Sequence, residues 1–246
     1  MTRNRPIPHL TDHDRDYIRG LLVHEDEAIL AFNKPSGLPS QVRGNRARNL
    51  DHLLWAFAKT NGKRPRLVHR LDVGTSGIIL AAQTQPDAAA LSNSLQQRDV
   101  TKTYFALVQG HFPARRSGTF NDPIARLETD GRSQIVVGHP QGKSAVTRWT
   151  IHARAGTVAF IELRPQTGRM HQLRVHLAHH GSPIIGDAIY GGAPGSRLAL
   201  HAAEISLSHP RSGAPAHFEA PLPDDFKAIA AYHKLDCMVS VRGCSG

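Results

Sequence analysis

An aspartate in the segment HRLDVGTSG, residues 69–77, has neighbours that suit chemistry. Asp72 follows Arg70 by two positions and precedes a Gly-Thr-Ser-Gly bend. If the segment ends a strand, the two side chains lie on the same face. A carboxylate among cations stays ionised, as a nucleophile or a group that stabilises an oxocarbenium ion must. A structural ion pair at a turn is the better explanation of a generic Arg-Leu-Asp, so the motif needs support from elsewhere in the chain.

A second candidate is RPQTGRMHQLRVHLAHHGSPIIGDAIYG, residues 164–191, where basic side chains crowd together. The pattern predicts a helix over RMHQLRVHLAHHG with Leu173 and the leucine four residues later facing the core. Arg174 lies at the edge of that face, where its guanidinium can reach a partly buried carboxylate. Arg169 and His171 fall in the first turn, where a phosphate is also favoured. A solvated basic helix is the alternative interpretation.

The third candidate is Tyr104 in KTYFALVQG, a segment that alternates as a strand does. Lys102 and Tyr104 share one face of that strand. Tyrosine can stack on a base, and it can donate a hydrogen bond or move a proton. A half-buried strand tyrosine is the simpler interpretation of this segment taken alone.

Two other kinds of site are disfavoured by the spacing of the residues. A metal site could use the histidines of the predicted helix, which are His171, His176, His179 and His180. The helix has no HExxH pair, and a neighbouring pair such as His179 and His180 should point to different faces. Ser76 and His69 do not indicate a hydrolase, because no GxSxG elbow surrounds the serine. We therefore expect no metal.

Composition narrows the class of partner. The chain has 246 residues, a net charge of +10 and 40% apolar residues. This suits a folded domain with a polyanionic partner, and nucleic acid is the first candidate. Two cysteines, Cys237 and Cys244, are too few for a disulfide scaffold, so we expect the reducing cytoplasm. We expect no membrane association, because no apolar run approaches the length of a span.

Hairpins and scattered helices must position the three candidates. Without the regular strand–helix alternation of a parallel sheet, the chain is expected to be α+β, with a mixed, mostly antiparallel central sheet flanked by helices and loops. The expected helices begin near Leu50 (ending at Gly62), Pro86, Arg169 and Pro223, and the expected strands cover LLVHEDEAILAFNKP, LVHRLD, GIILAAQ, TKTYFALVQG, SAVTRWTIHA, TVAFIELRP and LALHAAEISL. Residues 111–142 are expected to be irregular, with short strands around Phe120 and Ile135.

Together these segments resemble the RluA-type pseudouridine synthase family. VHRLDVGTSGIILAA resembles its catalytic motif, KTYFALVQG its tyrosine strand, and TGRMHQLRVHLAHHGSPIIGDAIYG its arginine motif and the following loop. ILAFNKPSGLP resembles its first strand and loop. The resemblance runs from about residue 20 to about residue 230 in the family's order, and motifs of this length are specific.

The resemblance implies a role for each candidate. Asp72 would be the catalytic aspartate, Arg174 would pair with it, and Tyr104 would stack on the target uracil and help remove its C5 proton. Arg70 would contact RNA and help displace the flipped nucleotide. Further substrate or RNA contacts are expected from His69, Thr75, Lys102, Arg169, His171 and Leu173. The fold implied has a central basic cleft, and the reaction implied needs no cofactor.

The resemblance also implies an organisation and a partner. We expect an N-terminal arm over 1–20, a catalytic domain over 21–235 and a C-terminal tail over 236–246. Many relatives carry a further N-terminal RNA-binding module, for which the arm is too short. Targeting to rRNA or tRNA would then fall to the arm and to basic loops at 43–48 and 63–66. We expect a monomer.

Two other functions remain open from the sequence. A nucleoside or nucleic-acid glycosidase would also need a carboxylate near C1′, together with a second carboxylate or an activated water. Glu162 and Asp187 are the candidates near the motifs. An RNA-binding protein that has lost its chemistry is the second alternative, but the residue types at 72, 104 and 174 are all present.

Overall fold

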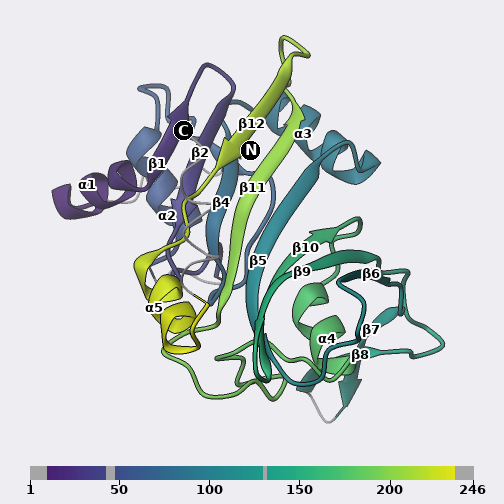
Figure 1. Ribbon diagram of the computed structural model, residues 1–246. Helices are drawn as coiled ribbons and strands as arrows, with labels where there is room; N and C mark the ends of the chain where they lie inside the picture. Colours follow the sequence, from purple (N-terminus) through teal and green to yellow (C-terminus); the bar gives the residue numbers. More distant parts are fainter. Residues whose placement is uncertain (1–9, 43–47, 130–131, 236–246) are drawn as a thin grey trace. The chain divides into compact units, whose positions relative to one another are not determined.

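The structure, a computed structural model, describes residues 10–42, 48–129 and 132–235 (Figure 1). Residues 1–9 of the expected arm, residues 43–47 of the basic loop expected at 43–48, and the expected tail therefore lie outside the described residues. The chain forms two compact units. Unit 1 comprises residues 1–100 and 206–220, and unit 2 comprises residues 101–205 and 221–246.

Antiparallel strands form the centre of unit 1. Its strands are β1 (Leu22–Glu25), β2 (Ile29–Lys34), β3 (Arg66–Leu67), β4 (Ser76–Ala82) and β12 (Pro215–Glu219). β2 pairs with both β1 and β4, and all seven residues of β4 are buried. The β1–β2 hairpin confirms the prediction for residues 21–35. Its turn is fixed by the Asp26 carboxylate, which accepts hydrogen bonds from the backbone N–H groups of Ala28 and Ile29.

Among the residues described, unit 1 contains three α-helices, α1 (Asp12–Gly20), α2 (Leu50–Leu53) and α3 (Gln85–Gln97). Asn49 caps α2 as predicted, accepting from the N–H of His52. The predicted continuation to Gly62 is wrong, because α2 gives way to a 3₁₀ turn over Leu54–Phe57. Leu50, Leu53 and Leu54 are fully buried across the two pieces.

A bidentate ion pair joins the two chain segments of unit 1. Arg211 donates through Nε and Nη2 to the two carboxylate oxygens of Asp87, each at 2.9 Å. Asp87 is buried, and it lies in the first turn of α3. The Arg211 hydrogen bond holds the pKa of that carboxyl below its usual range, although burial acts in the opposite direction.

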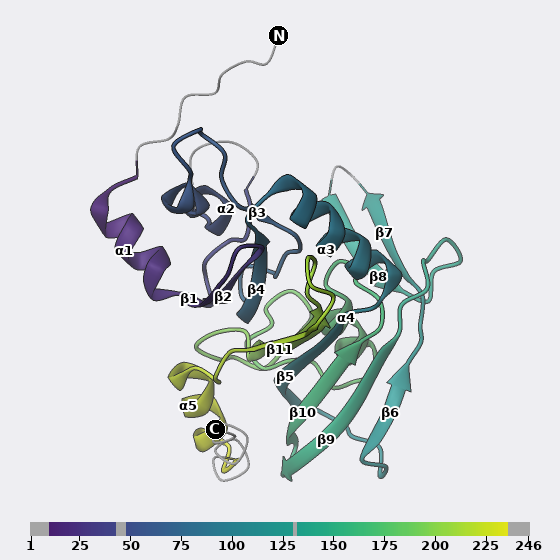
Figure 2. The same ribbon diagram turned by 90° about the horizontal axis from the view of Figure 1, so that it is seen from above.

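Unit 2 is built on long, curved antiparallel strands (Figures 1 and 2). Its strands are β5 (Thr101–Gln109), β6 (Ser117–Phe120), β7 (Ile124–Thr129), β8 (Arg132–Val137), β9 (Thr147–Ala155), β10 (Val158–Pro165) and the first part of β11 (Leu200–Ser208). The order β11-β5-β10-β9-β6 forms one sheet, and β7 with β8 forms a separate ribbon. The expected short strands around Phe120 and Ile135 are confirmed, whereas β7 was not predicted.

Two helices, α4 (Gln172–His179) and α5 (Asp224–Tyr232), pack on the core of unit 2. Leu173 and Leu177 of α4 join this core as predicted, and α5 adds Phe226. The predicted start of α4 at Arg169 is wrong, because His171 is its N-cap residue with φ 55°. Backbone in this left-handed region cannot continue a helix towards the N-terminus, so residues 169 and 170 stay outside it.

The expected α+β class, with a mixed and mostly antiparallel sheet, is confirmed. In the described ranges, no helix combines the length and the apolar character that crossing a membrane requires.

Candidate active site

Asp72 lies on a loop, and the predicted strand over LVHRLD is wrong beyond its first residue. β3 ends at Leu67, and β4 begins at Ser76. Asp72 is half-buried and its backbone carbonyl accepts from Thr75 N–H at 3.1 Å, which closes a tight turn. Arg70 is exposed. A carboxylate on a turn needs support from elsewhere in the fold to keep one position.

That support comes from the loop after β2, residues 34–40. The ammonium group of Lys34 is fully buried and donates to the carbonyls of Pro35 at 2.9 Å, Leu38 at 2.8 Å and Val73 at 3.3 Å. Lys34 thus ties its own loop to the residue that follows Asp72. Burying a lysine is tolerated only when its charge is met by acceptors in this way.

Two serines of the same loop form hydrogen bonds with the backbone before and after Asp72. Ser40 Oγ donates to the Leu71 carbonyl at 2.8 Å and accepts from Leu71 N–H at 3.1 Å. Ser36 Oγ donates to the Gly74 carbonyl at 2.8 Å, and Gly37 N–H donates to the Val73 carbonyl at 2.9 Å. The backbone is therefore held on both sides of Asp72. We call residues 34–40 the supporting loop.

Two residues expected to contact substrate, His69 and Thr75, also have a place in the structure of unit 1. His69 Nε2 accepts from the N–H of Leu80 in β4 at 3.1 Å, so this nitrogen is engaged with the backbone. The side chain of Thr75 is buried, at 2% exposure. Direct contact of either with RNA stays a prediction.

The arginine of the second motif has a partner within unit 2. Arg174 donates from Nε to Asp187 Oδ2 at 2.8 Å and from Nη2 to Asp187 Oδ1 at 2.7 Å. Both side chains are buried, at 8% and 0% exposure. Burial would raise the pKa of Asp187, but the hydrogen bonds and charge of Arg174 lower it, so the carboxyl is ionised at neutral pH. The pairing of Arg174 with Asp72 stays a prediction.

Aromatic and imidazole groups hold this ion pair in place. The Arg174 guanidinium carbon lies 5.2 Å from the centre of the Tyr190 ring, within the range of a cation–π contact. The Tyr190 hydroxyl is 2.8 Å from His171 Nδ1. Asp187 Oδ1 also accepts from the N–H groups of Ile189 and Tyr190. The segment that follows α4 thereby fixes the arginine that α4 carries.

A buried glutamine organises the turn before α4. Gln172 Oε1 accepts from Thr167 Oγ1 at 2.7 Å and from Arg169 N–H at 3.0 Å. Its Nε2 donates to the carbonyl of Val146 and to Thr147 Oγ1, both at 3.0 Å. Arg169 Nε reaches the carbonyl of Ser144 at 3.1 Å. The Thr-Gly turn is therefore a closed network, and phosphate binding by Arg169 stays a prediction.

Tyr104 and Lys102 share a face of β5, as predicted. Both are half-buried, while Thr103 and Phe105 between and beyond them are buried. Desolvation lowers the pKa of Lys102 to about 8, so this amine is easier to deprotonate than an ordinary lysine. Tyr104 packs against the core of unit 2, and so does Leu173, which has 8% exposure.

The carboxylates that a glycosidase would need are already engaged. Glu162 is buried and contacts His152 Nε2 at 2.9 Å and Arg164 Nε at 2.7 Å. Asp187 is held by Arg174 as described above. A general acid must hold a proton near neutral pH, and Asp187, whose pKa the Arg174 contact lowers, does not suit that role.

Several contributors were not identified from the sequence as site residues, above all Lys34, Ser40, Gln172 and Tyr190. Their segments, ILAFNKPSGLP and the stretch from Thr167 to Gly191, were recognised as part of the resemblance. A buried lysine and a buried glutamine cannot be told from solvated ones by residue type, because both are usually exposed.

Comparison with known proteins decides the family. Residues 28–179, more than half of the chain, match the RNA pseudouridylate synthase family. The chain belongs to this family. It is a pseudouridine synthase, an isomerase, and the expected membership is confirmed.

Curated and solved relatives agree with this assignment. The chain is 36% identical over 234 residues to ribosomal large subunit pseudouridine synthase D of Escherichia coli K12, covering 87% of this chain and 71% of that protein. The counterpart from Haemophilus influenzae is 35% identical with the same coverage. The solved structure of human RNA pseudouridylate synthase domain containing 4 covers 92% of this synthase at 25% identity, with a TM-score of 0.73.

Proposed function

We propose that this pseudouridine synthase converts a specific uridine of large-subunit rRNA to pseudouridine, with Asp72 as the catalytic carboxylate. The observation that carries the assignment to Asp72 is the supporting loop, which holds the backbone on both sides of one half-buried aspartate. A group of this kind is positioned in advance, which an enzyme needs at the reacting atom. The preference for large-subunit rRNA rests on the names of the relatives.

The chemistry breaks the N1–C1′ bond of uridine, turns the uracil and joins C5 to C1′. C5 loses its proton and N1 gains one, so the atoms balance without a cofactor. A uracil stacked in a helix is out of reach, so the nucleotide must flip out or lie in a loop. Asp72 attacks C1′, attacks C6, or removes the 2′ proton to give a glycal. Each route requires the carboxylate to be charged.

Three more residues take roles in this proposal. Tyr104 stacks on the uracil and helps to remove the C5 proton. A tyrosine suits both roles, and its place on β5 against the core of unit 2 limits its movement. Arg174 serves as the cationic partner of Asp72 in the reaction, and its own position is set by Asp187. Arg70 is exposed and contacts RNA as the target nucleotide leaves the stack.

Release of tritium from C5 of uracil tests the proposal. The substrate is large-subunit rRNA labelled at C5 and taken from cells that lack this synthase. The wild type should release tritium to water. Asp72→Asn should not, while it binds the same RNA with similar affinity, because it loses one charge and keeps the side-chain shape.

The matched control is Asp99→Asn, which neutralises an exposed aspartate outside the motifs and should leave release unchanged. Wild-type release by Asp72→Asn would refute the catalytic assignment. Release from a tRNA fraction but not from rRNA would refute the substrate class and leave the chemistry standing. Free uracil as the product would indicate a glycosidase. Binding with no release from either RNA would indicate an inactive RNA-binding protein.

A further inference from the structure

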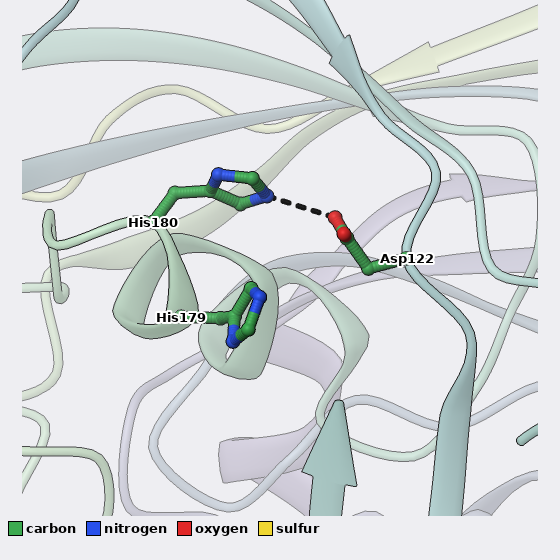
Figure 3. A group of neighbouring side chains, drawn as sticks. All are labelled: Asp122, His179 and His180. Carbon is green, nitrogen blue, oxygen red and sulfur yellow. Dashed lines mark hydrogen bonds and ion pairs between the residues drawn. The ribbon is translucent and has the colours of Figure 1, made fainter. Parts of the chain in front are cut away.

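A cluster of metal-ligating side chains lies in unit 2 at the C-terminal end of α4. His179 is the last residue of this helix and His180 is its C-cap residue, and Asp122 lies in the turn between β6 and β7 (Figure 3). One ligand atom from each of the three lies within 4.8 Å of the others. None of the three has a role in the proposed reaction.

The sequence pattern disfavoured a metal here because adjacent helical residues point to different faces, and the structure removes that objection. His180 lies past the regular helix as its C-cap residue, with φ −87° and ψ 17°, and one ring nitrogen of each histidine lies within 4.8 Å of the other. The two imidazole centroids are 5.2 Å apart and perpendicular. His180 Nε2 is 2.8 Å from Asp122 Oδ2 (Figure 3). Two neighbouring histidines thereby serve one location.

We propose that Asp122, His179 and His180 bind a divalent transition-metal ion, with Zn²⁺ as the best match. Two imidazole nitrogens are borderline donors, and together with one carboxylate they suit Zn²⁺ better than Mg²⁺ or Ca²⁺, which prefer oxygen ligands throughout. Metal–ligand distances near 2.1 Å place tetrahedral ligand atoms about 3.4 Å apart. The His179 side chain is exposed, so its rotation can bring the ligand atoms closer than the present 4.8 Å limit.

Neighbouring contacts hold the ligands as the outer shell of a metal site does. The buried imidazole of His176 bridges the Asp122 backbone carbonyl, at 3.0 Å from Nε2, and Thr147 Oγ1, at 3.1 Å from Nδ1. The ring of His180 stacks on Phe120 with centroids 4.3 Å apart. The turn that carries Asp122 and the ring of His180 are therefore positioned without the metal.

Electrostatics favour a cation at this place. The C-terminal end of a helix carries partial negative charge, so a cation is stabilised there. A bound ion would fasten the end of α4 to the β6–β7 turn.

The simpler alternative is an ion pair between protonated His180 and Asp122, with His179 as a bystander. Substitution of the exposed His179 distinguishes the metal site from the ion pair, because the ion pair does not involve this residue. Titration of untagged, metal-free protein with ZnCl₂ in a calorimeter provides the measurement. The wild type should bind one Zn²⁺ with a saturable isotherm.

The variants then decide whether the proposal holds. His179→Ala and Asp122→Asn should each weaken Zn²⁺ binding by at least about tenfold, the lower end of what loss of an outer-shell partner costs. His13→Ala, which removes an exposed histidine from α1, should leave the isotherm unchanged. Wild-type affinity in His179→Ala, or no saturable binding by the wild type, would overturn the proposal. His179→Ala decides the matter alone if Asp122→Asn fails to fold, and none of these outcomes depends on catalytic activity.

Discussion

Removing the carboxylate of Asp187 should destabilise unit 2 far more than removing an exposed acidic partner. Asp187 accepts two hydrogen bonds from Arg174 and two from backbone N–H groups, with its side chain 0% exposed. Asp187→Ala leaves a buried guanidinium without this partner and removes the acceptor of two N–H groups. Breaking a buried pair on one side costs about 3–5 kcal/mol. Since domains are stable by about 5–15 kcal/mol, this is a large fraction of the total.

The chain offers a matched control and a conservative variant. Glu128 pairs with Arg126 at 3.3 Å, but their side chains are 73% and 54% exposed, so Glu128→Ala should cost about 0–1 kcal/mol. Asp187→Asn keeps one carbonyl oxygen as an acceptor and should fall between the two alanine variants. The expected order of destabilisation is therefore Asp187→Ala, then Asp187→Asn, then Glu128→Ala.

The tryptophans make the assay specific to unit 2. The chain has two tryptophans, Trp55 in unit 1 and Trp149 in unit 2. A Trp55→Phe background leaves Trp149, which is 3% exposed in the core, as the reporter. Urea unfolding followed by its fluorescence gives the free energy of unfolding by linear extrapolation. If Asp187→Ala and Glu128→Ala lose the same amount, the buried ion pair does not stabilise unit 2 as argued.

Three further outcomes are expected. Lys34→Met should lower kcat at least tenfold in the tritium assay, because the carbonyls of Pro35, Leu38 and Val73 lose their donor at a cost of about 1–3 kcal/mol. An unchanged kcat would show that the supporting loop does not contribute to catalysis. Burial lowers the pKa of His176 below 6.5, and the hydrogen bond to the Asp122 carbonyl opposes this shift. The fold therefore favours the neutral imidazole, so the contribution of His176 to the free energy of unfolding is complete above pH 6.5 and declines as the pH falls. The unfolding free energy of the wild type relative to His176→Gln should therefore shrink between about pH 7 and 5.5, and a constant difference would contradict this sign. Affinity for RNA should fall steeply with salt given the net charge of +10, and a flat dependence in a filter-binding assay would exclude phosphate contacts as the main source of binding.

Most of the elements follow from local patterns in the sequence. The β1–β2 hairpin, β5, and the β9–β10 hairpin alternate or form buried runs between turn residues, so their existence could be predicted. The helix ends could not. α4 begins after His171 because that residue is in the left-handed region, and α2 gives way to a 3₁₀ turn at Leu54. Both outcomes depend on tertiary packing, which residue types alone do not specify.

Some residues of the candidate site could likewise be predicted from the sequence, and others could not. Asp72, Tyr104 and Arg174 could be named because long motifs resemble a family. Their supports could not, because Lys34 and Gln172 owe their roles to burial and to partners distant in sequence. The fixed backbone around Asp72 replaces the strand that was expected there. The resemblance thus named the candidate residues, and the fold shows how the backbone around Asp72 is held.

Each unit is built from two separate segments of the chain, and this affects how the protein folds while it is being synthesised. Unit 1 begins to emerge first, but Asp87 can pair with Arg211 only after a further 124 residues have been synthesised. All of residues 101–205, most of unit 2, leaves the ribosome in the meantime. Closing contacts over such separations is slow, and it exposes unpaired strand edges while the chain waits. A nascent chain stalled before residue 206 should therefore be open to chaperones and proteases at unit 1, the half that was synthesised first.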